Sequence, residues 1–287
     1  MTNLHKIRAR IRSVNSTQQI TRTMKMIAVS KLRKTQTSLA GVRLFADKSQ
    51  AVLNALLAGD ANFEHPYLTP RRHVGRVCYV VFWGNRGLCG AYNQLLLRHL
   101  EGLVRAEARP CSVIVCGRWG RDVLAGTDLP VRQIFSDLSD TPTMAEALEI
   151  AEELKNLYRT GEADEIHLVY QHFDSVLHQT PVHRQLLPAA PEPAANNNYL
   201  FVPDAQTVLD NVLELYLNNT VYAVMLEARV GEHAARMTAM TAATDSTAEL
   251  IEDLNLEFNR ARQAAITTEI SEIVGGSAAL KKSDKSD

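Results

Sequence analysis

The sequence predicts a mixed α+β and α/β fold. Both chain ends form a long antiparallel two-helix coiled coil, and an α/β domain of mostly parallel sheet is inserted between them. All ten prolines of the 287 residues lie between Pro66 and Pro203, and proline breaks helix interiors. Apolar residues recur at helical spacing at both ends, whereas the middle alternates short apolar runs with amphipathic segments. The boundaries we expect are 1–58 for the N-terminal helix, 59–203 for the inserted domain, 204–280 for the C-terminal helix and 281–287 for a disordered tail.

The N-terminal segment carries an apolar seam, meaning residues on one helical face that recur at steps of three and four. It comprises Leu4, Ile7, Ile11 and Val14, a polar stretch at Thr17, Gln18 and Thr21, and then Met24, Ile27 and Leu32. The pattern predicts a helix to about Leu57, just before Gly59 and a turn-rich stretch. At 1.5 Å per residue, such a helix spans roughly 80 Å.

The C-terminal segment has a longer seam. Its steps of three and four alternate strictly through Met237, Met240, Thr244, Thr247, Ile251, Leu254, Phe258, Ala261 and Ala265. This heptad spacing is typical of a left-handed coiled coil. The helix is expected to begin near Asp204 and to continue through its one interior glycine, Gly231.

Charge indicates what lies against this seam. The first forty-six residues carry ten Lys or Arg and no acid, whereas fourteen acids and seven bases follow from Asp204 onward. A basic helix attracts an acidic one, so we expect the two ends of the chain to pair with each other. The C-terminal helix is expected to be the longer. Its last apolar residues, Ile266, Ile270 and Ile273, would then project and fit a socket in another protein.

The middle of the chain reads as strands alternating with helices, which predicts a mostly parallel sheet. Strands are expected at 77–82, 112–116, 131–135 and 165–173, helices at 93–106 and from about Thr143, and a Pro-rich loop at 188–198. Neither "GNRGLCG" (84–90) nor "CGRWG" (116–120) has the spacing of a phosphate-binding loop, and we interpret each as a βα turn that needs positive φ.

The residue types point away from catalysis. Nine histidines form no HExxH pattern, and the four cysteines lack metal-site spacing. We therefore expect no metal, no cofactor and no catalytic residue, with His5 and His233 solvated. The net charge of −1 does not favour nucleic acid. A basic coiled-coil nucleic-acid-binding or adaptor protein is nevertheless the alternative, because the N-terminal helix is basic.

Long stretches at both ends closely resemble the gamma subunits of rotary F-type ATP synthases. The matching stretches are "IRARIRSVNSTQQITRTMKMIAVSKLRKTQ", "HPYL", "RGLCGAYN", "QLLP" and "EHAARMTAMTAATDSTAELIEDLNLEFNRARQAAITTEISEIVGGSAA". The resemblance implies a non-catalytic rotor shaft that couples flow of H⁺ or Na⁺ to sequential changes in the beta-subunit catalytic sites, in ATP synthesis or reverse hydrolysis. It implies three alpha and three beta subunits around the coiled coil, and the epsilon subunit and the c-ring at the foot. It also implies a peripheral place on the cytoplasmic face of the bacterial inner membrane.

The resemblance assigns roles to residues in the matching stretches. Contacts with the alpha and beta ring are implied for Met24, Lys25, Lys31, Arg33, Lys34, Arg262 and Gln263. A tip in an apolar bearing is implied for Ile266, Ile270, Ile273 and Val274. A foot loop on the epsilon and c-ring side is implied for Arg86, Gly87, Leu88, Cys89 and Gly90. Neither a small-molecule substrate nor nucleic acid is implied as a partner.

The chain departs from the family pattern around this loop and at its C-terminus. It has "FWGN" where a Ser/Thr-Asp pair is usual, "GAYN" where "GGLN" is common, and "LKKSDKSD" at the C-terminus. These departures are compatible with a divergent second copy of the subunit.

Overall fold

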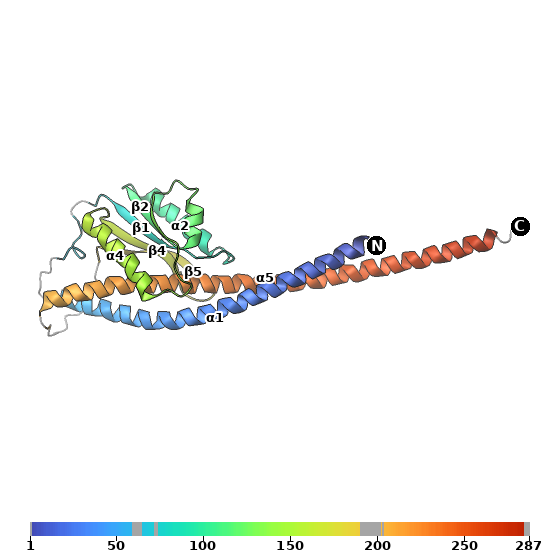
Figure 1. Cartoon of the computed structure of the whole chain (residues 1–287), viewed down its shortest axis with the longest axis horizontal. Helices are drawn as coiled ribbons and strands as arrows, with labels where there is room; N and C mark the ends of the chain where they lie inside the picture. Colours follow the sequence, from blue (N-terminus) through green and yellow to red (C-terminus); the bar gives the residue numbers. More distant parts are fainter. Residues whose placement is uncertain (1, 59–64, 72–73, 190–201, 203, 284–287) are drawn as a thin grey trace. The chain divides into compact units, whose positions relative to one another are not determined.

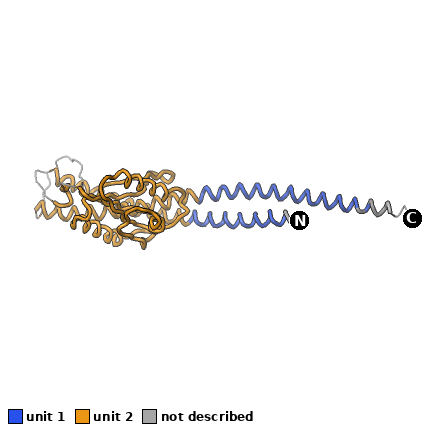
Figure 2. Tube along the Cα trace, turned by 90° about the horizontal axis from the view of Figure 1, so that it is seen from above, with its two compact units in different colours: residues 1–26, 240–287 blue, residues 27–239 orange. Residues whose placement is uncertain are grey.

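A computed structural model describes residues 2–58, 65–71, 74–189, 202 and 204–283. Most of the predicted Pro-rich loop and the last four residues of the predicted tail lie outside this range. The chain divides into two compact units. The coiled-coil unit contains residues up to 26 and from 240 onward, and the sheet unit contains residues 27–239 (Figure 2).

Two long helices come from the chain ends, as the periodicity predicts. Helix α1 covers Thr2–Ala58 and helix α5 covers Ala205–Ser283. The carboxylate of Asp204 accepts a hydrogen bond from the Thr207 backbone N–H at 2.8 Å, which satisfies one free donor at the start of α5. Gly231 does not interrupt α5, and the helix continues three residues into the segment 281–287 that was expected to be disordered.

In the coiled-coil unit the two helices lie side by side and run antiparallel (Figure 2). Arg8 lies over the ring of Phe258, 5.3 Å from its centroid, and Thr21 lies against Thr244. The seam residues Ile7 and Leu254 are buried, so the predicted heptad does form the contact between the helices. Helix α5 continues beyond the N-terminal end of α1 (Figure 2).

One seam position was predicted wrongly. Ile27 is 51% exposed, whereas its neighbour Ala28 is 1% exposed. The strict alternation of three and four from Thr21 leads through Lys25 and Ala28 to Leu32, and one residue around a helix is a turn of about 100°. Position on the heptad therefore decides burial here, and the greater hydrophobicity of Ile27 does not.

The sheet unit holds a five-stranded sheet of order β3-β2-β1-β4-β5 (Figure 1). The strands are β1 Val77–Phe82, β2 Cys111–Cys116, β3 Val131–Phe135, β4 Glu165–Phe173 and β5 Gln179–Leu187. The first four pair in parallel, and β5 pairs antiparallel with β4. Strand β5 was not predicted. It is an edge strand that holds Pro181 and mixes polar with apolar residues, and an edge strand tolerates both.

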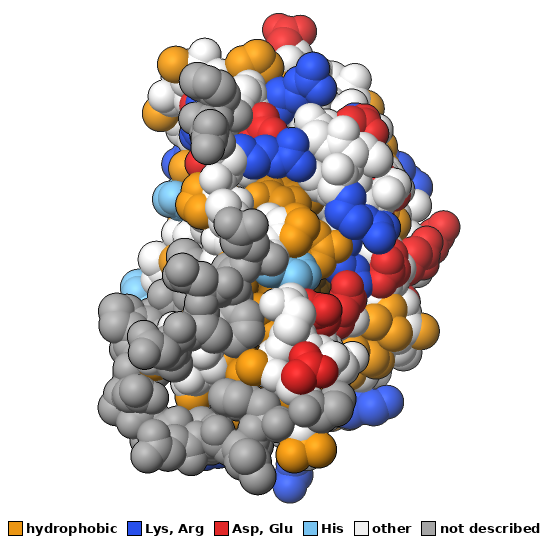
Figure 3. All heavy atoms as spheres, turned by 90° about the vertical axis from the view of Figure 1, so that its left-hand side faces the viewer, with side chains coloured by type: hydrophobic (Ala, Val, Ile, Leu, Met, Phe, Trp, Pro, Cys, Tyr) orange, Lys and Arg blue, Asp and Glu red, His pale blue; other side chains and the backbone are white. Residues whose placement is uncertain are grey.

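Helices cover both faces of this sheet: α2 Tyr92–Ala106, α3 Arg118–Leu124 and α4 Met144–Thr160. Successive side chains of β1 point to opposite faces. Val80 packs in the cluster with α4 and α5, whereas Tyr79 and Val81 pack in the cluster with α2. Thr143 and Glu146 form a capping box at the start of α4, close to the predicted start. The face shown in Figure 3 has basic side chains beside acidic ones over its described part.

Candidate partner-binding surfaces and a buried polar network

The free end of α5 exposes an apolar stripe. Ile266, Ile270, Ile273 and Val274 are exposed by 48%, 56%, 67% and 62%. Arg262 and Gln263, one turn earlier, are also exposed. They lie near the C-terminal end of α5, the helix that continues beyond the N-terminal end of α1 in the coiled-coil unit (Figure 2). Four large apolar side chains in water on one helix end form a surface suited to an apolar socket.

The predicted ring-contact residues of α1 differ in accessibility. Met24 and Lys25 are half-buried, and Arg33 and Lys34 are exposed. Lys31 forms an ion pair with Asp140 in the sheet unit, so its charge already has a partner within the chain. Arg33 and Lys34 are thus the members of this group with the freest positive charge among the described residues.

A polar layer interrupts the apolar seam of the coiled-coil unit. The Thr244 hydroxyl donates to the Thr21 hydroxyl oxygen at 2.9 Å and also lies 2.7 Å from the Met240 carbonyl oxygen. Both threonines are almost fully buried. A single polar pair at heptad positions fixes the register of a coiled coil at some cost in stability.

The threonine pair gives a first prediction. Replacing Thr21 with valine is expected to lower the free energy of unfolding by about 1 kcal/mol, because Thr244 keeps a buried hydroxyl with one partner fewer. The double change to valine is expected to be nearly neutral, since both hydroxyls are then gone. Urea unfolding of the parent, both single variants and the double variant measures the coupling. Additive costs would contradict a direct interaction between the two hydroxyls.

The loop between β1 and α2 is held in a βα turn, as predicted. Leu88 and Gly90 both have φ of 59°, a region that favours glycine and is uncommon for leucine. The backbone N–H of Gly84 donates to the Asn93 side-chain oxygen at 3.0 Å. Cys89 is buried, so only Arg86, Gly87, Leu88 and Gly90 of the predicted foot loop are accessible to a partner.

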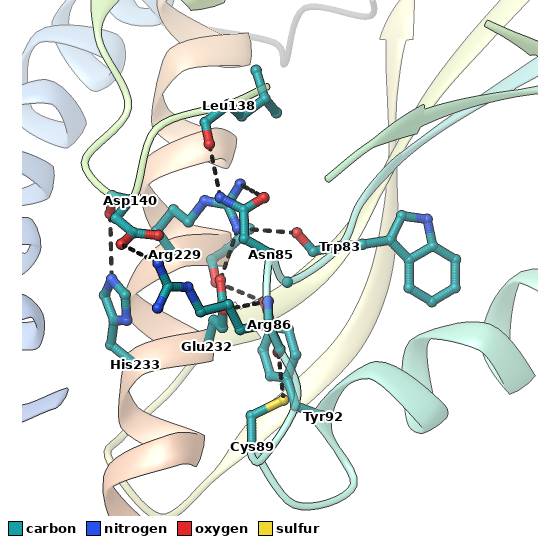
Figure 4. A network of polar contacts seen from close by, with 12 residues as sticks. Trp83, Asn85, Arg86, Cys89, Tyr92, Leu138, Asp140, Arg229, Glu232 and His233 are labelled. Atoms are coloured by element: carbon teal, nitrogen blue, oxygen red, sulfur yellow. Dashed lines mark hydrogen bonds and ion pairs between the residues drawn. The ribbon is translucent and has the colours of Figure 1, made fainter. Parts of the chain in front are cut away.

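A buried ionic network joins this loop to α5 (Figure 4). At its centre is the Glu232 carboxylate, which lies 2.7 Å from the Arg229 guanidinium and 2.6 Å from that of Arg236. It also accepts from the Arg86 backbone N–H at 3.3 Å. Burial raises the pKa of this carboxyl, but the two guanidinium groups outweigh that effect and hold the pKa below its usual value. Glu232 is therefore a charged group inside the fold.

The two arginines reach the loop backbone. Arg229 donates to the Trp83 carbonyl oxygen at 3.3 Å and to the Asn85 side-chain oxygen at 2.9 Å. Arg236 donates to the Arg86 carbonyl oxygen at 3.1 Å and to that of Gly87 at 3.3 Å. Charge-assisted bonds of this kind are stronger and more directional than neutral ones, so α5 and the loop are fixed together.

A second loop, between β3 and α4, completes the network (Figure 4). Asn85 donates to the Leu138 carbonyl oxygen at 2.7 Å, and His233 Nε2 lies 3.3 Å from the Asp140 carbonyl oxygen. The Asp140 carboxylate pairs with Lys31 of α1. Both long helices therefore meet at the β3–α4 loop within the sheet unit.

Arg229, Glu232 and Arg236 were not predicted from the sequence as site residues, and His233 was wrongly placed in solvent. His233 is buried, because the face of α5 that packs on the loop includes it. A usable signal was present: "ARVGEHAARM" sets Arg, Glu and Arg at steps of three and four within an apolar stretch. That spacing places the three charges on one helical face, where they pair with one another.

His233 gives a prediction for pH. Its Nε2 faces a carbonyl oxygen and its Nδ1 faces Arg236 at 3.4 Å, an arrangement suited to the neutral ring. Burial lowers the pKa of His233 below 6.5; Glu232 opposes this, and the two arginines add to it. The folded state thus binds fewer protons than the unfolded state near pH 6. The contribution of neutral His233 to the free energy of unfolding is therefore fully present above pH 6.5. It is lost as the pH falls toward the lowered pKa.

The check is the urea midpoint of the purified chain, measured between about pH 8 and about pH 5, a range that brackets the ordinary histidine pKa. His233→Gln keeps one donor and one acceptor but does not titrate, so its midpoint is expected to fall less below pH 6.5 than that of the parent. His65, His99 and half-buried His167 also have lowered pKa values and remain as a background in both proteins. If the urea midpoint changes with pH in the same way for His233→Gln and the parent, His233 does not take up a proton on unfolding.

Comparison with known proteins decides the family. A family model described as ATP synthase matches residues 3–280. The ATP synthase gamma chain of Desulfitobacterium hafniense is 43% identical over 98% of this chain and 100% of its own length. The chain belongs to the ATP synthase gamma-chain family. The gamma chain of Moorella thermoacetica is 42% identical with the same coverage.

Solved structures carry the same fold. A chain from the mitochondrial ATP synthase of Euglena gracilis, in its OSCP/F1/c-ring, rotational state 3, matches with a TM-score of 0.71 at 21% identity, over 97% of this chain and 95% of that one. A chain from the rotor of the same enzyme in rotational state 1 matches with a TM-score of 0.65 at 19% identity, over 92% and 99%. In this gamma-chain family member, "RGLCG" and "EHAARM", far apart in sequence, meet in the buried network.

No helix in the described ranges is long and apolar enough to cross a membrane.

Proposed function

We propose that this chain is the central rotor shaft of an F-type ATP synthase. It couples ion flow across the membrane to sequential conformational change at the beta-subunit catalytic sites, and ATP hydrolysis turns it in reverse. The observation that carries the proposal is an antiparallel coiled coil with an exposed apolar end on α5, in a chain that matches a gamma chain over that protein's whole length. Such a rod has the shape and surface to turn inside a ring.

The coupling is mechanical and reciprocal. A two-helix rod has different residues on its different sides, so each surrounding subunit meets a different surface at any given angle. If nucleotide bound at a catalytic site stabilises one rotation angle of the shaft, then that angle stabilises the same nucleotide-bound state by the same free energy. Linkage between two equilibria acts in both directions. The chain needs no reacting side chain for this role.

The partners are three alpha and three beta subunits around the coiled coil, with the epsilon subunit and the c-ring at the foot. Contacts with the ring come from Met24, Lys25, Arg33, Lys34, Arg262 and Gln263, and Lys31 contributes where its pair with Asp140 opens. The exposed atoms of Arg86, Gly87, Leu88 and Gly90 offer a separate contact surface. The chain sits with its complex on the cytoplasmic face of a bacterial inner membrane.

The tip is proposed to turn in an apolar bearing. Ile266, Ile270, Ile273 and Val274 provide contacts without direction, which resist rotation little. Arg262 and Gln263 instead provide directional, charge-assisted bonds that form at one angle and break at another. The two neighbouring groups thus serve opposite needs, free turning and a preferred angle.

The test is co-expression with the alpha and beta subunits of the same organism, purified through a tag on beta. A complex of three alpha, three beta and one copy of this chain, with multi-site ATPase that is lost when the chain is omitted, is the expected result. Alpha and beta subunits that assemble and turn over equally well without the chain would overturn the proposal.

A change at the tip gives a further prediction. Replacing Ile266 and Ile270 with aspartate is expected to reduce assembly or ATPase severalfold, because an unpaired carboxylate in an apolar socket costs several kcal/mol. Leu177→Asp is the control, since Leu177 is 81% exposed on the turn between β4 and β5. An equal loss of assembly or ATPase in the tip variant and in Leu177→Asp would contradict a specific role for the tip.

A further inference from the structure

Within the sheet unit, α5 is attached by two kinds of contact in succession. From Leu209 to Ala228 its inward side chains are mostly apolar and lie in the cluster shared with the sheet and α4. Asn219, Thr220 and Glu227 are the buried polar exceptions, and Glu227 pairs with Arg43 and His172 away from the loop network. From Arg229 to Arg236 the inward side chains include the three charged residues of the buried network. The side chains that face the β1–α2 loop thus follow a stretch whose contacts with the sheet and α4 are mostly apolar.

Apolar contacts hold the helix in place but specify its rotation weakly. Burial of apolar area is non-directional, so a small turn of α5 about its own axis exchanges one apolar neighbour for another. Hydrogen bonds behave differently, because they weaken steeply outside a narrow range of distance and angle. At a helix radius of about 6 Å with side chains, a turn of 20° moves a side-chain end by roughly 2 Å. That movement breaks a hydrogen bond.

The network bonds are arranged to oppose such a turn. Arg229 reaches Trp83 and Asn85 at the start of the loop, whereas Arg236, two turns later on α5, reaches Arg86 and Gly87. Glu232 holds both guanidinium groups in place between these contacts. Two anchor points on one rigid helix fix its rotation as well as its position.

Packing reinforces the same stretch. The Tyr92 hydroxyl donates to the Ala228 carbonyl oxygen at 2.7 Å. A Cβ on Gly231 would lie 3.0 Å from a ring carbon of Tyr92, so the ring sits tightly against the helix backbone. Replacing a buried ion pair by apolar residues is often neutral or stabilising. The charged set is therefore better explained by what it orients than by the stability it adds.

We propose that Arg229, Glu232 and Arg236 are positioning residues that lock the rotation of α5 about its own axis to the sheet, so that torque enters α5 without slip. The inference rests on the proposed shaft function and adds to it the residues that carry the load. The lock matters only when the shaft works against a resisting force. Without load, the apolar contacts are sufficient to turn the two parts together.

Arg236→Lys tests the lock, since it keeps the charge near Glu232 and loses the fork that reaches two carbonyl oxygens. Arg132→Lys is the matched control, because Arg132 pairs with Glu162 on the surface of the sheet unit. Each complete complex is placed in vesicles. ATPase is measured with an uncoupler present, and ATP-driven ion pumping is measured against a rising gradient.

For Arg236→Lys we expect ATPase without load close to that of the parent, and ions pumped per ATP lowered at least about threefold at high gradient, since charge-assisted hydrogen bonds are lost. Arg132→Lys is expected to match the parent throughout. Equal pumping by Arg236→Lys and the parent at every gradient would overturn the lock. If Arg236→Lys fails to assemble, Asn85→Ala removes the loop partner of Arg229 and is judged by the same two outcomes.

The parent complex separates this proposal from the proposed function. If the parent pumps ions in proportion to ATP and Arg236→Lys does so equally, only the lock fails. If the parent complex hydrolyses ATP without any dependence on this chain, the shaft function itself fails.

Discussion

Glu232→Ala is expected to lower the free energy of unfolding by about 3–5 kcal/mol, the cost of removing one partner from a buried ion pair. Two guanidinium groups then remain buried beside each other without their shared carboxylate. Their remaining hydrogen bonds go to neutral oxygens of Trp83, Asn85, Arg86 and Gly87, and these do not neutralise two positive charges. The backbone N–H of Arg86 also loses its acceptor.

Urea unfolding of the purified chain measures this cost, with Glu162→Gln as the matched control. Glu162 pairs with Arg132 at 2.6 Å, but both side chains are substantially exposed. Such pairs contribute about 0–1 kcal/mol, so the control is expected to unfold close to the parent. Similar losses in both variants would mean that burial does not set the cost, which would contradict our description of the network.

Gly117→Ala is the second large effect. Gly117 has φ of 120°, where an L side chain is strained, and a Cβ there would lie 2.6 Å from the Trp83 carbonyl oxygen. That oxygen cannot easily move, because the Trp83 N–H is bonded to the Cys116 carbonyl oxygen at 2.8 Å and Arg229 donates to the oxygen itself. We expect a loss of about 1–3 kcal/mol from backbone strain and a similar amount from overpacking.

Gly102→Ala is the control for this change. Gly102 lies on the exposed side of α2, and a Cβ there meets nothing within 4 Å. Alanine favours a helix interior by up to about 1 kcal/mol over glycine, so this variant is expected to unfold at slightly higher urea than the parent. A Gly117→Ala variant as stable as the parent would show that the loop after β2 rearranges freely.

The long helices could be predicted because their signals are repetitive. A heptad pattern that continues for dozens of residues without proline predicts a coiled-coil helix. The opposite charges of the two chain ends indicate that the two helices pair with each other. The prediction was wrong where hydrophobicity was allowed to outweigh position, as at Ile27. Strand β5 was missed because an edge strand with one exposed side needs no continuous apolar run.

The buried network could be predicted only in part. The spacing of Arg229, Glu232 and Arg236 is visible in the sequence and suggests mutual pairing. What lies opposite them is a loop more than a hundred residues earlier in the chain, and its contribution is mostly backbone carbonyl oxygens. Main-chain acceptors leave no trace in residue type, so neither the depth of the network nor the burial of His233 could be read from the sequence.

The continuity of α5 restricts how the length of this chain can change. Arg236, the last network residue, is followed one turn later by Met240 of the seam, with no break in the helix between them. One inserted residue there would turn everything after it by about 100° relative to everything before it. Seven inserted residues would leave a mismatch of only about 20°. We therefore expect insertions and deletions in this stretch to be tolerated only in whole heptads, whereas surface turns accept single residues.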